Sequence, residues 1–157
     1  MEESIDFVKW FSELNKDSKS IAGGKGANLS EIFNLGVPVP QGFVVTAQAY
    51  NYFIDKVELR EKIEELLSRI DYEDTKQLDE ITKQIRVFIM DSEFPEDMKE
   101  EILEAYSHLD VGTLDKESRS ALAILKNSSE PVFVAVRSSA TAEDLADASF
   151  AGQQASF

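Results

Sequence analysis

The feature that most constrains this chain is a run of apolar residues near its C-terminal end that stops at an arginine. Residues 132–136 read VFVAV without alternation, which is typical of a strand buried on both faces. A guanidinium directly after such a strand needs partners, because its desolvation is costly. Arg137 is followed on the expected turn by the hydroxyls of Ser138, Ser139 and Thr141. Such donors at the end of a strand suit a phosphate group.

Two interpretations of this segment stay open from the spacing alone. In the first, Arg137 contacts a phosphate. In the second, Arg137 pairs with Glu143 or Asp144 and only holds a loop in place. The later stretch Ser149–Gln154 (SFAGQQ) is rich in small residues, so its backbone N–H groups could approach an anion closely.

A second candidate anion site lies at Ser20–Asn28 (SIAGGKGAN), where three glycines surround Lys25. The pattern is not that of a Walker loop, because GxxxxGK[ST] does not fit. We expect a permissive loop that leads into a helix with Leu29, Ile32 and Phe33 on one face, ending at Gly36. Lys25 would then lie near a helix N-terminus, which favours anions. The alternative is a glycine turn that carries a solvated lysine.

Composition limits the function classes. The chain has 157 residues, enough for one domain or part of one, and 43% of them are hydrophobic. It has no cysteine and one histidine, so thiolate and multi-histidine metal sites are excluded. A net charge of −14 disfavours a nucleic-acid partner. No apolar run approaches membrane length and no signal peptide is recognisable, so we predict a cytoplasmic protein without a membrane partner.

Periodicity predicts an α+β fold. Phe7–Leu14 is typical of a short strand that turns into a helical turn, and Gly42–Val45 is expected to share a sheet with residues 132–136. Thr46 is expected to cap a helix over 47–54 that buries Tyr50, Phe53 and Ile54.

Residues 58–125 are predicted to be mostly helical. Four apolar stripes at helical spacing support this, comprising Leu59, Ile63, Leu66, Leu67 and Ile70, then Leu78, Ile81, Ile85 and Phe88, then Met98, Ile102, Ala105, Tyr106 and Leu109, and lastly Ala121, Leu122 and Leu125. Asp74 with Gln77 resembles a capping box, and the third helix is expected to open near Pro95. His108 is expected to have a surface or capping role.

Two long stretches carry a family resemblance. These are IAGGKGANLSEIFNLGVPVPQGFVVTAQAYNYF and VAVRSSATAEDLADASFAGQQASF, in that order. They resemble the N-terminal ATP-binding region of phosphoenolpyruvate synthases, a region whose ancestry is shared with pyruvate phosphate dikinases and rifampicin phosphotransferases. The two stretches span 57 of the 157 residues. It implies the N-terminal lobe of an ATP-grasp fold over residues 1–157, with a helical insertion at about 58–125.

The resemblance also implies roles for individual residues. Lys25 is similar to the family lysine that contacts the nucleotide, Arg137 to the arginine on the phosphates, and Ser149–Gln154 to the loop that lies over them. The implied ATP-binding set is Lys25, Arg137, Gly24, Ser138, Ser149, Gly152 and Gln153. The sequence departs from the family pattern where Ala146 replaces a usual proline and Ala155 a commonly acidic residue. These departures bear on the stiffness of the loop.

The family reaction transfers a phosphoryl group from ATP to a histidine and then to pyruvate, giving phosphoenolpyruvate, AMP and phosphate. The resemblance places that histidine, the acidic Mg2+ ligands and the pyruvate site outside this chain. We therefore expect no catalytic residue and no metal ligand here, and we expect the remaining domains of a longer polypeptide as partners. The alternatives are the ATP-binding lobe of a rifampicin phosphotransferase-like enzyme and a stand-alone nucleotide-binding module without turnover.

Overall fold

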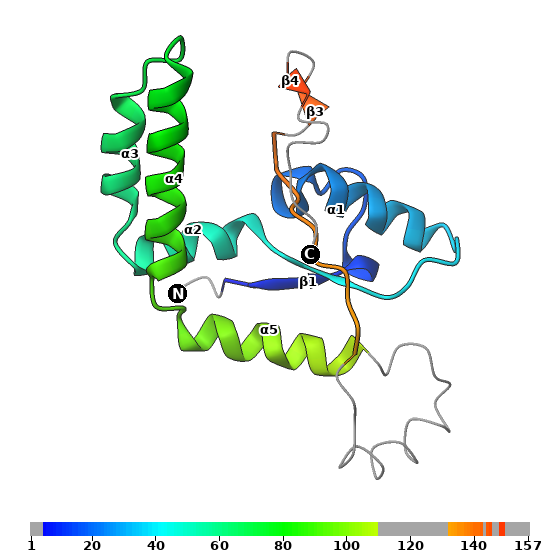
Figure 1. The fold of residues 1–157 in the computed structure, drawn as a ribbon. Helices are drawn as coiled ribbons and strands as arrows, with labels where there is room; N and C mark the ends of the chain where they lie inside the picture. Colours follow the sequence, from blue (N-terminus) through cyan, green and yellow to red (C-terminus); the bar gives the residue numbers. More distant parts are fainter. Residues whose placement is uncertain (1–4, 110–131, 143, 146–147, 150–157) are drawn as a thin grey trace.

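The computed structural model describes residues 5–109, 132–142, 144–145 and 148–149 (Figure 1). Its first sheet consists of β1 (Val8–Trp10) and β2 (Phe43–Val45), which pair antiparallel with Lys9 opposite Val44. β1 runs directly into the 3-10 helix η1 (Phe11–Glu13). The predicted strand followed by a helical turn, and the predicted strand that ends at residue 45, are therefore confirmed.

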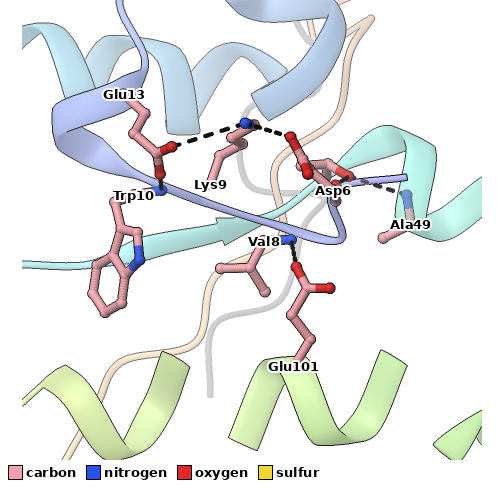
Figure 2. Close-up of polar contacts among 8 residues, drawn as sticks. Asp6, Val8, Lys9, Trp10, Glu13, Ala49 and Glu101 are labelled. Carbon is pink, nitrogen blue, oxygen red and sulfur yellow. Dashed lines mark hydrogen bonds and ion pairs between the residues drawn. The ribbon is translucent and has the colours of Figure 1, made fainter. Parts of the chain in front are cut away.

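The outer edge of β1 is closed by carboxylates. Glu101, on the helix that runs beneath β1, accepts a hydrogen bond from the Val8 N–H at 2.9 Å, and Glu13 accepts one from the Trp10 N–H at 2.7 Å (Figure 2). An edge strand with free N–H groups is a template for another strand, and charged groups on the edge prevent such pairing. The β1 edge of this sheet is therefore occupied from within the chain.

The glycine-rich segment is helical. Helix α1 (Lys19–Asn34) begins before the glycines and contains one residue with non-helical dihedrals, Gly23, at φ 69° and ψ 173°. The prediction of a loop over residues 20–28 is therefore wrong: the irregular backbone is confined to one position. Ala22 and Ala27 of α1 are buried, and such tertiary packing outweighs the low helix propensity of the glycines between them. The predicted stop is confirmed, because Gly36 follows the helix at φ 77°.

Helix α2 (Ala47–Lys56) is capped as predicted, since Thr46 Oγ1 accepts a hydrogen bond from the Ala49 N–H at 3.1 Å. Phe53 is buried, but Tyr50 is 54% exposed, so its predicted burial is wrong. The buried face is centred on Ala49 and Phe53, and Tyr50 lies about 100° around the helix from Ala49. The core cluster that includes this face consists of Phe7, Ala49, Phe53, Ile54, Leu59 and Met98.

Three further helices follow. α3 (Arg60–Ser68) and α4 (Thr75–Asp91) form a hairpin that extends away from the sheet, and α5 (Glu96–His108) runs beneath β1 (Figure 1). The helical prediction is thus confirmed over most of residues 60–108. The fourth predicted stripe, at 121–125, lies outside the described residues. Pro95 is the N-cap of α5, as expected from its position.

Asp74 caps α4, but the predicted capping box is only half formed. Asp74 Oδ1 accepts hydrogen bonds from the N–H groups of Lys76 and Gln77 at 3.0 and 3.2 Å. The Gln77 side chain instead accepts from the Asp71 N–H at 2.7 Å. Gln77 therefore stabilises the turn before the cap rather than the cap residue itself.

Residues 132–136 do not form the predicted strand. They have no regular secondary structure, and residues 133–136 are exposed, with Phe133 99% accessible. An apolar strand is buried only where neighbours supply hydrogen-bond partners at its edges and apolar surface on its faces. The two sheets of the described residues do not include this segment, so the shared sheet predicted with Gly42–Val45 is wrong here. Its start is held by α5, where the Tyr106 hydroxyl donates to the Val132 carbonyl at 2.7 Å.

Candidate functional site

The two predicted anion-binding segments meet in space. The chain that follows residue 132 passes β1 and reaches α1 (Figure 1). There the Ser139 hydroxyl donates to the Ala22 carbonyl at 2.6 Å and accepts from the Gly26 N–H at 2.9 Å. The Gly24 N–H donates to the Ala140 carbonyl at 3.0 Å. We call these three hydrogen bonds the Ser139 clasp.

The clasp explains why the helix breaks at Gly23. A side chain there would need a positive φ, and its Cβ would lie 2.4 Å from Ser139 Oγ and 2.5 Å from the Ser139 carbonyl oxygen. Gly26 is similarly close-packed, since a Cβ there would be 3.1 Å from Ala22 Cβ and 3.2 Å from Val44 Cγ2. The glycines therefore allow one segment of the chain to approach the backbone of another.

The break also creates a second helix start within α1. Helical dihedrals resume at Gly24, and the first N–H groups of a helical segment lack partners within it. Two of these groups, from Gly24 and Gly26, are satisfied by Ala140 and Ser139. Ser139 thus plays the part of an N-cap, although it lies more than a hundred positions from this helix start in the sequence. The N–H groups of Gly24 and Gly26 are therefore not directed at an anion.

Lys25 lies between the two clasped glycines, in the first turn after the break, and is exposed. Its predicted place near a helix N-terminus therefore holds for the helical segment that begins at Gly24. Arg137 and Ser138 are also exposed, whereas Ser139 is half-buried. The structure brings the backbones that carry Lys25 and Arg137 together through the clasp.

The remaining predicted site residues are only partly described. Strands β3 (Asp144–Leu145) and β4 (Ala148–Ser149) pair antiparallel, with Asp144 opposite Ser149. Gly152 and Gln153 lie outside the described residues. So does Glu143, one of the two carboxylates weighed as a partner for Arg137.

A separate open groove of about 530 Å³ lies between β1 and α5. The carboxylates of Asp6, Glu13, Glu101 and Glu104 line it, together with Lys9 and His108. The Lys9 ammonium pairs with Asp6 at 2.6 Å, and this hydrogen bond raises the pKa of Lys9 (Figure 2). A surface with more carboxylates than cations repels phosphate, so the groove is unsuited to a nucleotide.

His108 lines this groove at the C-terminal end of α5 and is exposed. Its Nδ1 lies 2.7 Å from the Glu104 carbonyl oxygen in the last turn of α5. This agrees with the surface or capping role predicted for it. Among the residues that the structure describes, no group of three or more histidine, aspartate or glutamate side chains could hold a metal ion.

Comparison with known families gives a match over residues 19–157 to the family described as "Pyruvate phosphate dikinase, AMP/ATP-binding domain". The chain belongs to this family. Among curated relatives, it is 47% identical over 152 residues to a "Probable phosphoenolpyruvate synthase" of Methanocaldococcus jannaschii. It is 38% identical over 183 residues to the "Phosphoenolpyruvate synthase" of Pyrococcus furiosus, and 41% identical over 152 residues to that of Helicobacter pylori.

These alignments cover nearly all of this chain and a small part of each relative. They include 97%, 96% and 94% of the chain, but 12%, 21% and 17% of the respective relative. The resemblance inferred from the sequence motifs is therefore confirmed, and the chain corresponds to one segment of much longer dikinase-family proteins. In the described part of the chain, no helix has the length and apolar character needed to cross a bilayer.

From the sequence, Ser139 was one of three hydroxyls after Arg137 and Gly23 one of three glycines around Lys25, but a contact between these two residues was not predicted. The sequence signal for such a contact was the pair of adjacent glycines before Lys25. A turn needs only one glycine, so the second indicates that something else approaches the backbone there. The structure shows what approaches: the hydroxyl and the carbonyl of Ser139 lie against Gly23.

Proposed function

We propose that this chain is the ATP-binding N-terminal part of a phosphoenolpyruvate synthase. The observation that carries the proposal is the Ser139 clasp, which joins the GGKG segment to the VRSSA segment of a chain in the pyruvate phosphate dikinase AMP/ATP-binding family. Lys25 and Arg137 then act together on the phosphates of ATP. The implied ATP-binding set includes Gly24, Ser138 and the stretch from Ser149 through Gly152 and Gln153.

The chemistry that these residues would supply is charge neutralisation and orientation. Phosphoryl transfer depends on positioning and on stabilising negative charge, with little covalent chemistry for the protein to perform. Arg137 offers planar, bidentate donors, and Lys25 offers a compact point charge. The complete polypeptide would convert ATP, pyruvate and water into phosphoenolpyruvate, AMP and phosphate through a histidine outside this chain.

Other parts of the proposal rest on the family resemblance. These are the ATP-grasp arrangement, a lobe that closes on ATP together with another domain, and a cytoplasmic location. The resemblance implies that Mg2+ would be held by ligands elsewhere in the polypeptide. No step proposed for Lys25 or Arg137 depends on that ion.

The test is ATP-dependent formation of phosphoenolpyruvate by the complete polypeptide. Each charged hydrogen bond to phosphate contributes about 1.5–3 kcal/mol, so Arg137→Ala should lower kcat/KM for ATP by roughly ten- to a hundredfold or more. Lys25→Ala should have a similar effect. Arg137→Lys should recover only part of the loss, because an ammonium cannot make a bidentate contact.

Matched controls separate phosphate binding from a general loss of charge. Lys83→Ala and Arg69→Ala each remove an exposed cation that pairs four residues away on its own chain segment, with Asp79 and Glu65 respectively. Both should leave turnover unchanged. The proposal fails if Arg137→Ala keeps full activity, or loses activity only in proportion to the fraction of protein that unfolds.

A further inference from the structure

Ser139 makes two hydrogen bonds with one oxygen, and both reach across the break in α1. Its Oγ donates to the Ala22 carbonyl on one side of Gly23 and accepts from the Gly26 N–H on the other. A hydroxyl can donate and accept through the same oxygen, which alanine cannot do. The backbone bond from Gly24 to Ala140 adds a third link between the segments.

The clasp has a defined relation to both proposed phosphate ligands. Lys25 is flanked by Gly24 and Gly26, and each of these glycines donates its N–H to the clasp. Arg137 precedes Ser139 by only two residues in the chain. A shift of the clasp would therefore move the two cations relative to each other.

We propose that Ser139 is a positioning residue that sets the spacing of Lys25 and Arg137 for a nucleotide polyphosphate. This inference rests on the proposed function. It assigns Ser139 no contact with ATP: the hydroxyl acts through the backbone on either side of Lys25. Ser138, its exposed neighbour, belongs to the implied ligand set, whereas Ser139 is half-buried and turned to the helix.

A structural serine on the same helix provides a matched control. Ser30 is fully buried, and its hydroxyl donates to the Gly26 carbonyl at 2.8 Å. It thus bonds the same glycine as Ser139 but makes no link to residues 132–142. Ser30→Ala should alter stability without changing the register between the two segments.

The first measurement concerns the clasp itself, in the complete polypeptide without nucleotide. Ser139→Ala should accelerate amide hydrogen exchange in peptides covering residues 22–28, because the Gly26 N–H loses its acceptor. Exchange in peptides from α4 should stay unchanged. Unchanged exchange at 22–28 would overturn the inference without bearing on ATP binding.

The second measurement is a double-mutant cycle on the same polypeptide, with ATP affinity and kcat/KM for ATP as readouts. A displacement of about 1 Å at a positioning group can cost on the order of a hundredfold, so Ser139→Ala should lower kcat/KM for ATP by about ten- to a hundredfold. KM for pyruvate should stay constant. In the Lys25→Ala background the same change should cost about threefold or less, because coupled sites are non-additive.

The outcomes distinguish this inference from the proposed function. A wild-type polypeptide that binds no ATP overturns both. If the wild type binds ATP and Ser139→Ala has the same kcat/KM for ATP as the wild type, only the positioning role is overturned. The same holds if Ser139→Ala lowers kcat/KM for ATP equally in the presence and absence of Lys25. A loss in Ser139→Ala that Ser30→Ala does not reproduce, and that shrinks when Lys25 is absent, supports it.

Discussion

The α3–α4 hairpin and the Ser139 clasp are stabilised by contacts of different range. Polar contacts in the hairpin join near neighbours, such as Lys83 with Asp79 and Thr82 with the Leu78 carbonyl, each four residues apart. The clasp joins Ser139 to residues 117 and 113 positions away. Interactions of the first kind follow from sequence spacing, whereas those of the second kind depend on which surfaces meet.

The α3–α4 hairpin is part of the scaffold, whereas the Ser139 clasp is part of the candidate site. The hairpin extends from the rest of the fold and carries exposed charge, while the clasp lies where the two family motifs meet (Figure 1). A change in the hairpin should therefore affect local stability alone. A change at the clasp should affect stability and nucleotide binding together.

The largest effect is expected from Gly23→Ala. Gly23 has φ 69° and ψ 173°, a conformation open essentially to glycine alone, which costs an alanine about 1–3 kcal/mol, and the overlap with Ser139 adds about 1–3 kcal/mol. Denaturant unfolding and ATP titration of the complete polypeptide should show lower stability and weaker ATP binding. Gly36→Ala is the control, because Gly36 also has a positive φ but a Cβ there meets no atom within 4 Å. Equal losses in the two variants would show that the Ser139 contact is not tight.

A medium effect is expected in the hairpin from Asp74→Ala. Removing an N-cap acceptor costs about 1 kcal/mol, within a range of roughly 0.5–2 kcal/mol. Asp74→Asn keeps an acceptor for the Lys76 and Gln77 N–H groups and should retain most of the stability. Circular dichroism and denaturant unfolding measure both. If Asp74→Ala also accelerated hydrogen exchange at residues 22–28, the proposed independence of hairpin and clasp would be wrong.

A smaller effect, this time an increase in stability, is expected from a substitution at Glu58, just after α2. Glu58 has a φ of 55°, and the bonds from the Glu58 N–H to Asp55 and from the Leu59 N–H to Ile54 form a Schellman ending of α2. Glycine is the preferred residue at this position, so Glu58→Gly should raise the free energy of unfolding by about 0.5–1 kcal/mol. Glu58→Ala keeps the backbone strain and should not stabilise. A loss of stability in Glu58→Gly would refute this account of the strain.

The smallest effect concerns pH and one exposed pair. Hydrogen bonding to the Arg60 guanidinium lowers the pKa of Asp55 below its ordinary value of 3.8. A depressed carboxyl pKa contributes stability above the pKa of the unfolded chain, and this is lost as pH falls through the folded-state pKa. Arg60→Ala should raise the pKa of Asp55, measured by NMR titration of the carboxyl, and any loss of stability should vanish in acid.

Asp97 provides the internal reference for that titration. Its pKa is lowered chiefly by the hydrogen bond from the Tyr52 hydroxyl, with further contributions from the Met98 N–H and Lys56. The pKa of Asp97 should therefore stay constant in Arg60→Ala. A parallel rise of both values would point to a general change in the fold rather than the loss of one local partner.

Local sequence patterns predicted most of the scaffold. Apolar residues at helical spacing located α4 and α5, and the caps at Thr46 and Asp74 were recognised because a cap bonds the backbone two or three residues away. Gly36 marked the end of α1 for an equally local reason, its positive φ. The family motifs in sequence order were enough to predict the membership that the comparisons confirm.

Tertiary contacts decided the features that sequence patterns misplaced. Residues 132–136 have the composition of a buried strand, but burial requires neighbouring strands, and the described sheets do not include this segment. Gly23 alone breaks α1 because Ser139 approaches it, and that approach depends on residues over a hundred positions away. Periodicity encodes contacts within about one helical turn, so the sequence by itself determined most of the helices and their caps. Its motifs determined the family. Only the folded chain determined which serine clasps the glycine segment, because that choice depends on how two distant backbones meet.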